Sequence, residues 1–153
     1  MTSATPAEIS KEIIAFCKEI DPTYPPVFIP VAQSEEVRFN YCMTDVPKFV
    51  EKNGGSVQYG WTIWEDPSIS LEAEFHATWI NPRGKLIDVT PKSDGESKIL
   101  YLKDSWRLYE NKLVDNIRKP LVDHWVMKLW VMQGKLKFQI RQTIFKLKKF
   151  FKC

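Results

Sequence analysis

An alternation of apolar and polar residues between positions 57 and 89 constrains the fold of this 153-residue chain more than any other feature. Three segments alternate in this way, residues 57–63, 71–79 and 85–89, and such a period-two pattern is typical of half-buried β-strands. The last two are joined by Asn81-Pro82-Arg83-Gly84. Proline at the second position and glycine at the fourth favour a type I turn followed by a glycine bulge. The sequence therefore predicts consecutive antiparallel strands.

The turn also predicts the register of its hairpin. If Asn81 pairs with Lys85, counting back places Thr78 opposite Asp88. His76 and Asp88 then lie on the same face of the sheet as diagonal neighbours, within reach of polar side chains. A slip of one residue would put them on opposite faces. We therefore expect His76 and Asp88 to lie close together.

Helices are expected on both sides of these strands. The capping box Thr5-Pro6-Ala7-Glu8 predicts an amphipathic helix over residues 6–20. A second helix should begin at Thr44 or Asp45, because Pro47 fits only the first turn of a helix, and residues 53–55 should end it. The predicted fold is an α+β domain, residues 1–134, in which an antiparallel sheet packs on the helix preceded by Cys42. A basic amphipathic tail, residues 135–153, follows Gly134, so the domain carries additional N- and C-terminal helices.

Length and composition narrow the class of protein. A domain of this length buries roughly 70% of its unfolded surface and needs no metal or disulfide to fold. The three cysteines, Cys17, Cys42 and Cys153, form no CxxC or Cys/His cluster, so neither a disulfide framework nor a metal site is expected. No motif calls for a cofactor. Without a signal-peptide profile or an apolar run of about 18 residues, the expected location is cytoplasmic, with peripheral membrane contact as the alternative.

A thiol near a histidine and an aspartate on adjacent strands is the arrangement that nucleophilic catalysis requires. The imidazole removes the thiol proton, and the carboxylate orients the ring. The N-terminus of a helix lowers the pKa of a nearby thiol. Cys42, His76 and Asp88 are therefore candidate catalytic residues. The alternatives are a small buried cysteine, a solvent-facing histidine and an aspartate that caps a turn.

Two short segments resemble a known family. His76-Ala77-Thr78-Trp79 and Asp88-Val89-Thr90-Pro91 resemble the "His-x-x-Trp, turn, Asp-x-Thr" hairpin of the transglutaminase-like branch of the papain-like cysteine protease superfamily. The resemblance covers about residues 38–91. It implies that Cys42 is a nucleophile, His76 its general base and Asp88 the orienting acid.

The same resemblance implies a class of reaction and its partners. The expected activity is thiol-dependent acyl transfer on a protein or peptide substrate, by an amidase, peptidase, deamidase or transglutaminase-type enzyme. The oxyanion would bind the Cys42 backbone N–H and one side chain, for which Gln33, Asn40 and Gln58 are equal candidates.

The C-terminal segment has a charge pattern of its own. All 19 acidic residues lie at or before Asp123, whereas eight of the 22 basic residues follow it. A basic amphipathic helix with aromatic residues is typical of binding to an anionic membrane or a protein partner. The alternative function is thus a non-enzymatic adaptor, unless the helix simply docks on the domain. Nucleic acid is disfavoured, because no recognised module accompanies the charge. The predicted binding residues are Lys135, Lys137, Arg141, Lys146, Lys148, Lys149 and Lys152.

Overall fold

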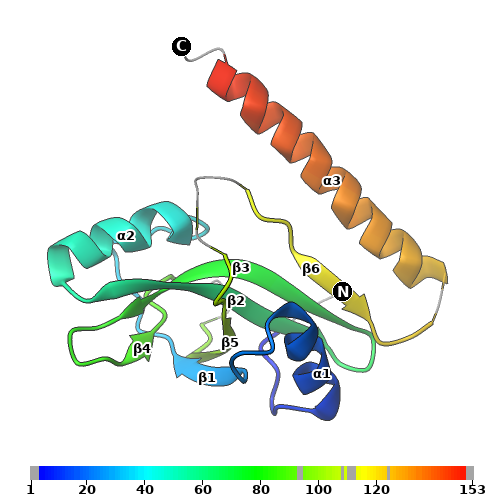
Figure 1. Ribbon diagram of the computed structural model, residues 1–153, viewed down its shortest axis with the longest axis horizontal. Coiled ribbons are helices and arrows are strands. Elements are labelled where there is room, and N and C mark those ends of the chain that lie inside the picture. The colour runs from blue at the N-terminus through cyan, green and yellow to red at the C-terminus, as the bar shows by residue number, and fades with distance from the viewer. Residues whose placement is uncertain (1–3, 93–94, 108, 110–112, 124, 151–153) are drawn as a thin grey trace.

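The structure of the chain is a computed structural model that describes residues 4–92, 95–107, 109, 113–123 and 125–150, with side chains as far as Ile144. It confirms an α+β fold with an antiparallel sheet and three helices (Figure 1). The elements follow in the order α1 (Lys11–Ile20), β1 (Val27–Pro30), α2 (Cys42–Asn53), β2 (Ser56–Asp66), β3 (Ser70–Ile80), β4 (Leu86–Ile87), β5 (Lys98–Lys103), β6 (Ile117–Pro120) and α3 (Trp125–Phe150).

The sheet is built around the long hairpin β2–β3. Its strands have the order β1-β5-β2-β3-β4, and β6 pairs with the first residues of β3. Strand β4 pairs with the other end of β3, through Trp79 opposite Ile87 and Ile80 opposite Leu86. The middle of β3, residues 74–78, therefore lies between β4 and β6 along one edge, and its backbone can contact another element there.

The two ends of the sheet meet at Asp88. An isolated parallel bridge joins Val31 to Asp88. The Asp88 N–H donates to the Pro30 carbonyl over 3.0 Å, and the Ala32 N–H donates to the Asp88 carbonyl over 2.8 Å. Asp88 is thus held by backbone bonds to the segment after β1. A small apolar cluster fills the space beside this junction, formed by Ile29, Ile99 and Tyr101 with Val31 and Leu86 packed against them.

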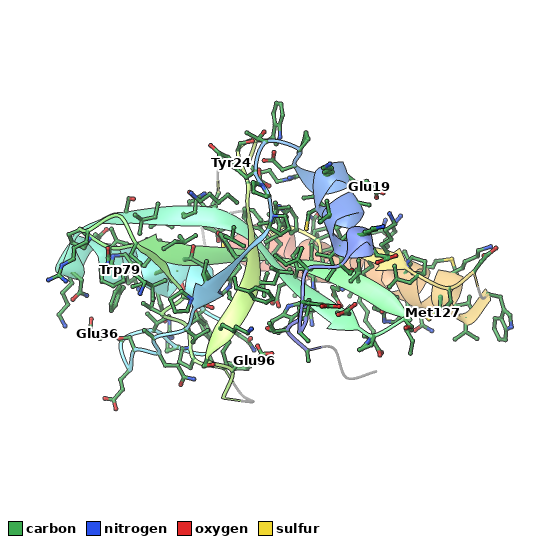
Figure 2. All side chains as sticks on the ribbon, turned by 90° about the horizontal axis from the view of Figure 1, so that it is seen from below. Glu19, Tyr24, Glu36, Trp79, Glu96 and Met127 are labelled. Carbon is green, nitrogen blue, oxygen red and sulfur yellow. The ribbon has the colours of Figure 1, made fainter. Side chains whose placement is uncertain are left out.

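The helices α1 and α2 both pack on the face of the sheet opposite to the small cluster of Ile29, Ile99 and Tyr101. Phe16 of α1 is 1% exposed against a cluster that includes Trp61 and Phe75. Full burial of such a side chain stabilises the fold by about 1.5–3 kcal/mol. At the other end, which Figure 2 marks with Trp79, Phe49 of α2 meets the Trp79 ring edge-on with centroids 5.1 Å apart. These contacts fix α2 over β3.

The start of α1 corrects the sequence prediction. The helix begins at Lys11, not at Pro6, and its N-cap is Ser10, whose hydroxyl accepts a hydrogen bond from the Ile13 N–H. Thr5 instead donates from its N–H and its hydroxyl to the carboxylate of Glu96, over 2.8 and 2.9 Å. Serine caps a helix as well as threonine does. The long-range partner Glu96 therefore decides which of the two residues becomes the cap.

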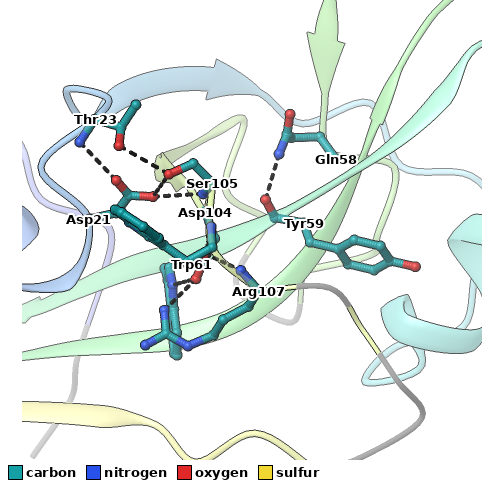
Figure 3. A network of polar contacts seen from close by, with 9 residues as sticks. Asp21, Thr23, Gln58, Tyr59, Trp61, Asp104, Ser105 and Arg107 are labelled. Atoms are coloured by element: carbon teal, nitrogen blue, oxygen red, sulfur yellow. Dashed lines mark hydrogen bonds and ion pairs between the residues drawn. The ribbon is translucent and has the colours of Figure 1, made fainter.

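A polar network ties the end of α1 to the end of β5 (Figure 3). Asp21, which is 0% exposed, accepts hydrogen bonds from the Ser105 N–H and hydroxyl over 2.7 and 2.6 Å. The next carboxylate, Asp104, accepts from the Trp61 indole over 2.8 Å. Since these three bonds end on carboxylates, they depend on both aspartates staying ionised.

The C-terminal helix α3 lies beside β6 and extends past the sheet (Figure 1). It continues without a break through Gly134, the residue after which the predicted tail begins. A Cβ at this position would lie 2.6 Å from the guanidinium of Arg118, so glycine lets this side chain cross the helix. Of the described helices, none is long and apolar enough to cross a membrane.

Candidate functional site

Cys42 is the first residue of α2, which corrects the predicted start at Thr44 or Asp45. The backbone N–H groups of Thr44 and Asp45 both donate to the Tyr41 carbonyl, so the first turn forms around Cys42. Pro47 consequently lies inside the helix, where it cannot donate to the carbonyl of Met43. The thiol therefore sits at the positive end of the helix dipole.

An ion pair holds the first turn of α2. Arg38 donates to the Asp45 carboxylate from Nε over 2.7 Å and from Nη2 over 2.9 Å, and its backbone N–H donates over 3.2 Å. These bonds, opposed by burial, hold the Asp45 pKa well below its usual range. The Arg38 guanidinium also lies 4.1 Å from the centre of the Tyr41 ring. The loop before Cys42 is thereby fixed on the first turn of the helix.

His76 and Asp88 lie in contact, as the hairpin register predicts. The Asn81 N–H donates to the Lys85 carbonyl over 2.9 Å, which confirms the expected pairing. His76 Nε2 then lies 3.0 Å from Asp88 Oδ2, with the two side chains 7% and 0% exposed. The other carboxylate oxygen of Asp88 accepts a hydrogen bond from the Thr90 N–H over 2.9 Å. The carboxylate is therefore fixed on both sides.

Lys92 also reaches this carboxylate, a contact that the sequence gives no reason to expect. Its Nζ lies 2.6 Å from Asp88 Oδ2, and its side chain is only 8% exposed. The contacts of His76 and Lys92 with Oδ2 have the distances of ion pairs, although neither is aligned as a hydrogen bond. The attraction between opposite charges, rather than an aligned hydrogen bond, thus holds Oδ2.

The Cys42 thiol lies close to this pair. The His76 side chain and the Ala77 N–H both act to lower its pKa, which places the thiol beside the His76 ring and the edge of β3. Ala77 belongs to the middle of β3, which pairs with neither β4 nor β6. Because Nε2 faces Asp88, Nδ1 is the ring nitrogen left for the thiol. Cys42, His76 and Asp88 are hereafter the Cys42 cluster.

Electrostatics favour a thiolate and an imidazolium in this cluster. Burial raises the Cys42 pKa, but the positive charge of His76 and the bonds from His76 and Ala77 outweigh it and lower the pKa overall. Burial lowers the His76 pKa, but the negative charges of Asp88 and Cys42 raise it overall. By contrast, burial raises the pKa of Cys17 to about 12. Burial thus disfavours the thiolate of Cys17, whereas the surroundings of Cys42 favour its thiolate.

Two half-buried phenols face the thiol and were not among the predicted site residues. Burial and the negative charge of Cys42 raise the pKa of Tyr59, and Tyr109 is affected in the same way. The two rings lie 5.8 Å apart, and Tyr59 stacks on Phe75 with centroids 6.2 Å apart. The alternation in β2 could have placed Tyr59 on this face, because it pairs with Ala77. For Tyr109 the sequence carries no such signal.

The three oxyanion candidates differ in their surroundings. The Gln58 amide donates to the Tyr59 carbonyl over 2.7 Å, so that donor is occupied. Gln33 is exposed, between two residues whose N–H groups donate to the carbonyls of Asp88 and Val89. Asn40 is exposed two residues before Cys42, with a left-handed φ of 63°. Gln33 thus lies beside the segment that carries Asp88, and Asn40 lies in the loop that leads to Cys42.

The predicted binding residues of the tail fall into two groups. Lys135, Lys137 and Arg141 are exposed on α3. Lys146, Lys148 and Lys149 belong to α3, but their side chains are outside the described part of the structure, as is the whole of Lys152. The tail is therefore described as a basic surface only as far as Arg141.

Metal-binding groups and surface hollows were sought across the described part of the chain. Within the described ranges, no group of three His, Cys, Asp or Glu residues is placed to hold a metal ion. Two surface hollows lie elsewhere, one between α3 and residues 113–118 and one between α1 and residues 22–26. Comparisons of the chain with protein-family models, curated proteins and solved structures found no match.

Proposed function

We propose that the chain is a thiol-dependent acyl-transfer enzyme in which Cys42 is the nucleophile. One observation carries the proposal: a buried histidine lies 3.0 Å from a buried carboxylate, and a thiol at the N-terminus of a helix lies near enough for that histidine to lower its pKa. This is the relationship of nucleophile, base and orienting group that covalent catalysis requires. It agrees with the resemblance to the transglutaminase-like branch of the papain-like superfamily.

The proposed reaction proceeds through a thioester. The Cys42 thiolate attacks the carbonyl carbon of an amide, and the tetrahedral oxyanion accepts a hydrogen bond from the Cys42 N–H. The carbon–nitrogen bond then breaks, and His76 gives its proton to the leaving amine. A water molecule or a second amine attacks the thioester while His76 takes its proton, and the Cys42 thiolate leaves. Asp88 stabilises the imidazolium in both halves of the reaction.

An activated ester tests the chemistry without knowledge of the natural substrate. The protein would be incubated with p-nitrophenyl acetate, quenched in acid and analysed by intact mass and peptide mapping. We expect one acetyl group on Cys42, absent from Cys42→Ser and retained in the matched control Cys17→Ser. Acetylation confined to Cys17 or Cys153, or a rate in His76→Gln equal to that of the unmodified chain, would reject the assignment.

The exposed face of α3 supports a second candidate function. Leu129, Met132, Leu136 and Ile140 are 38–60% exposed. Their spacing of three and four residues places them in one stripe, opposite Met127, which is 4% exposed. The stripe is long, apolar and open along the side of the helix that faces away from the sheet.

We infer that this stripe binds an anionic membrane surface. Every charged residue of α3 is a lysine or an arginine. Two copies packed along their stripes would bring like charges together, which disfavours self-association. A bilayer with anionic lipids instead accepts the apolar stripe and attracts the lysines, each by about 1 kcal/mol.

Vesicle binding tests the second candidate. We expect co-sedimentation with vesicles that contain phosphatidylserine, not with pure phosphatidylcholine, and weaker binding as salt rises. Leu136→Gln should weaken binding, whereas Ile14→Gln, an exposed apolar residue of α1, should not. If the chain ignores anionic vesicles at low salt, the membrane proposal fails, and binding to an acidic protein would take its place.

A further inference from the structure

Lys92 shares one oxygen of Asp88 with His76. The ammonium lies 2.6 Å from Oδ2 and the imidazole 3.0 Å from the same atom. The thioester chemistry proposed above assigns no step to Lys92. Lysine is nevertheless almost never buried without a partner, because removing its charge from water is costly. An 8% exposed lysine beside the cluster therefore calls for an explanation.

The local backbone holds Lys92 in place. The Thr90 N–H bonds Asp88 Oδ1, so the chain turns directly after the aspartate. Pro91 fixes the next backbone angle. The side chain of Lys92 is then directed back over the aspartate, although the two residues belong to no helix. Lys92 is thus built into the same turn that orients the carboxylate.

A second cation on one carboxylate has a predictable electrostatic effect. A negative charge near His76 favours the imidazolium, and a positive charge nearby disfavours it. Among the residues that the structure describes, three phenols face the cluster. Tyr59 and Tyr109 lie near the thiol, and the Tyr101 hydroxyl bonds the carbonyls of Gln58 and His76. These phenols are uncharged at neutral pH, so none of them adds a positive charge as Lys92 does.

We propose that Lys92 is a positioning residue of the Cys42 cluster: its ammonium anchors the Asp88 carboxylate and shares its negative charge, so that His76 holds its proton less tightly. The effect of Lys92 on the proton affinity of His76 follows from the two distances to Oδ2. Its importance for catalysis rests on the proposed acyl transfer. In that reaction His76 must both hold a proton, to keep the thiolate, and release it to the leaving amine. A base that binds its proton too tightly would slow the second step.

The test is the titration of His76, followed by NMR without substrate. Lys92→Met removes the charge and keeps an unbranched apolar side chain, Lys92→Arg keeps the charge, and Lys85→Met removes an exposed lysine elsewhere. In Lys92→Met the His76 imidazolium should titrate about one pH unit higher. Lys92→Arg and Lys85→Met should titrate as the unmodified chain does. A residue that serves folding alone would not move the titration in this direction.

Two results would overturn the proposal. One is a folded Lys92→Met variant in which His76 titrates at the same pH or lower. If Lys92→Met does not fold, Lys92→Gln carries the same comparison. Loss of folding in both variants is the second contrary result, because Lys92 would then hold the fold rather than adjust His76. Since no substrate is used, these results are independent of whether Cys42 forms an acyl-enzyme.

Discussion

Asp88 Oδ2 lies 3.0 Å from His76 Nε2, and the turn Asn81–Gly84 is what brings the two residues together. The Thr90 N–H bonds the other carboxylate oxygen, and the Lys92 ammonium lies against Oδ2 beside His76. Asp88 is therefore a structural anchor as well as the partner of His76. Substitutions at this residue should affect both stability and thiol chemistry, and the two effects can be separated.

Asp88→Asn should destabilise the protein and slow Cys42 alkylation at low pH. The amide keeps the acceptor for the Thr90 N–H but leaves Lys92 buried without a counter-charge. Removing one partner of a buried ion pair costs about 3 kcal/mol or more. The double variant Asp88→Asn/Lys92→Met should regain part of that stability in urea unfolding and still alkylate slowly. Equal stability of the single and double variants would contradict the shared ion pair.

Pro47→Ala should raise the melting temperature. Alanine restores the N–H that can bond the Met43 carbonyl and relieves a proline that costs about 3 kcal/mol in a helix interior. Greater freedom of the unfolded chain offsets about 1 kcal/mol of this gain. Calorimetry measures the change, with Pro26→Ala, outside any helix, as the control. A lower melting temperature would mean that the proline ring is needed in the packing of α2.

Asp21 should make stability depend on pH. Burial raises its pKa, but hydrogen bonds from Ser105 and Thr23 lower it overall to well below the usual value. Its stabilisation is therefore fully present above the unfolded-state pKa of about 3.9 and is lost as pH falls toward the folded-state value. Asp21→Asn should cost about 1–3 kcal/mol at pH 7.

The difference between Asp21→Asn and the unmodified chain should shrink near pH 3. Urea unfolding at the two pH values measures it. An unchanged difference at low pH would show that the carboxylate charge is not what the Ser105 bonds require. The network lies at the ends of α1 and β5, so Cys42 alkylation should be the same in both proteins.

The local parts of the fold could be predicted from the sequence. The hairpin register followed from the chemistry of a four-residue turn, which acts over a few residues, and it placed His76 beside Asp88. The first residues of the helices were harder to predict, because distant partners decide between equally good caps. Thr5 bonds Glu96 and so does not cap α1. Arg38 bonds Asp45 and so stabilises the first turn of α2. These partners are not visible in a local pattern.

The remaining features of the site depend on tertiary structure. Lys92 reaches Asp88 only because a non-helical turn directs it there. The Ala77 N–H is available to the thiol only because β4 and β6 leave the middle of β3 unpaired on that edge. Tyr109 approaches the cluster from the chain after β5. No spacing rule relates these residues to Cys42.

The pH dependence of Cys42 alkylation tests the central claim most directly. Iodoacetamide labelling would be followed by mass spectrometry of the Cys42 peptide in the unmodified chain and in His76→Gln. We expect the unmodified chain to alkylate with an apparent pKa well below the free-thiol value of about 8.5, and His76→Gln to move toward that value or above it. A Cys42 profile like that of a free thiol, or one that His76→Gln leaves unchanged, would contradict the account.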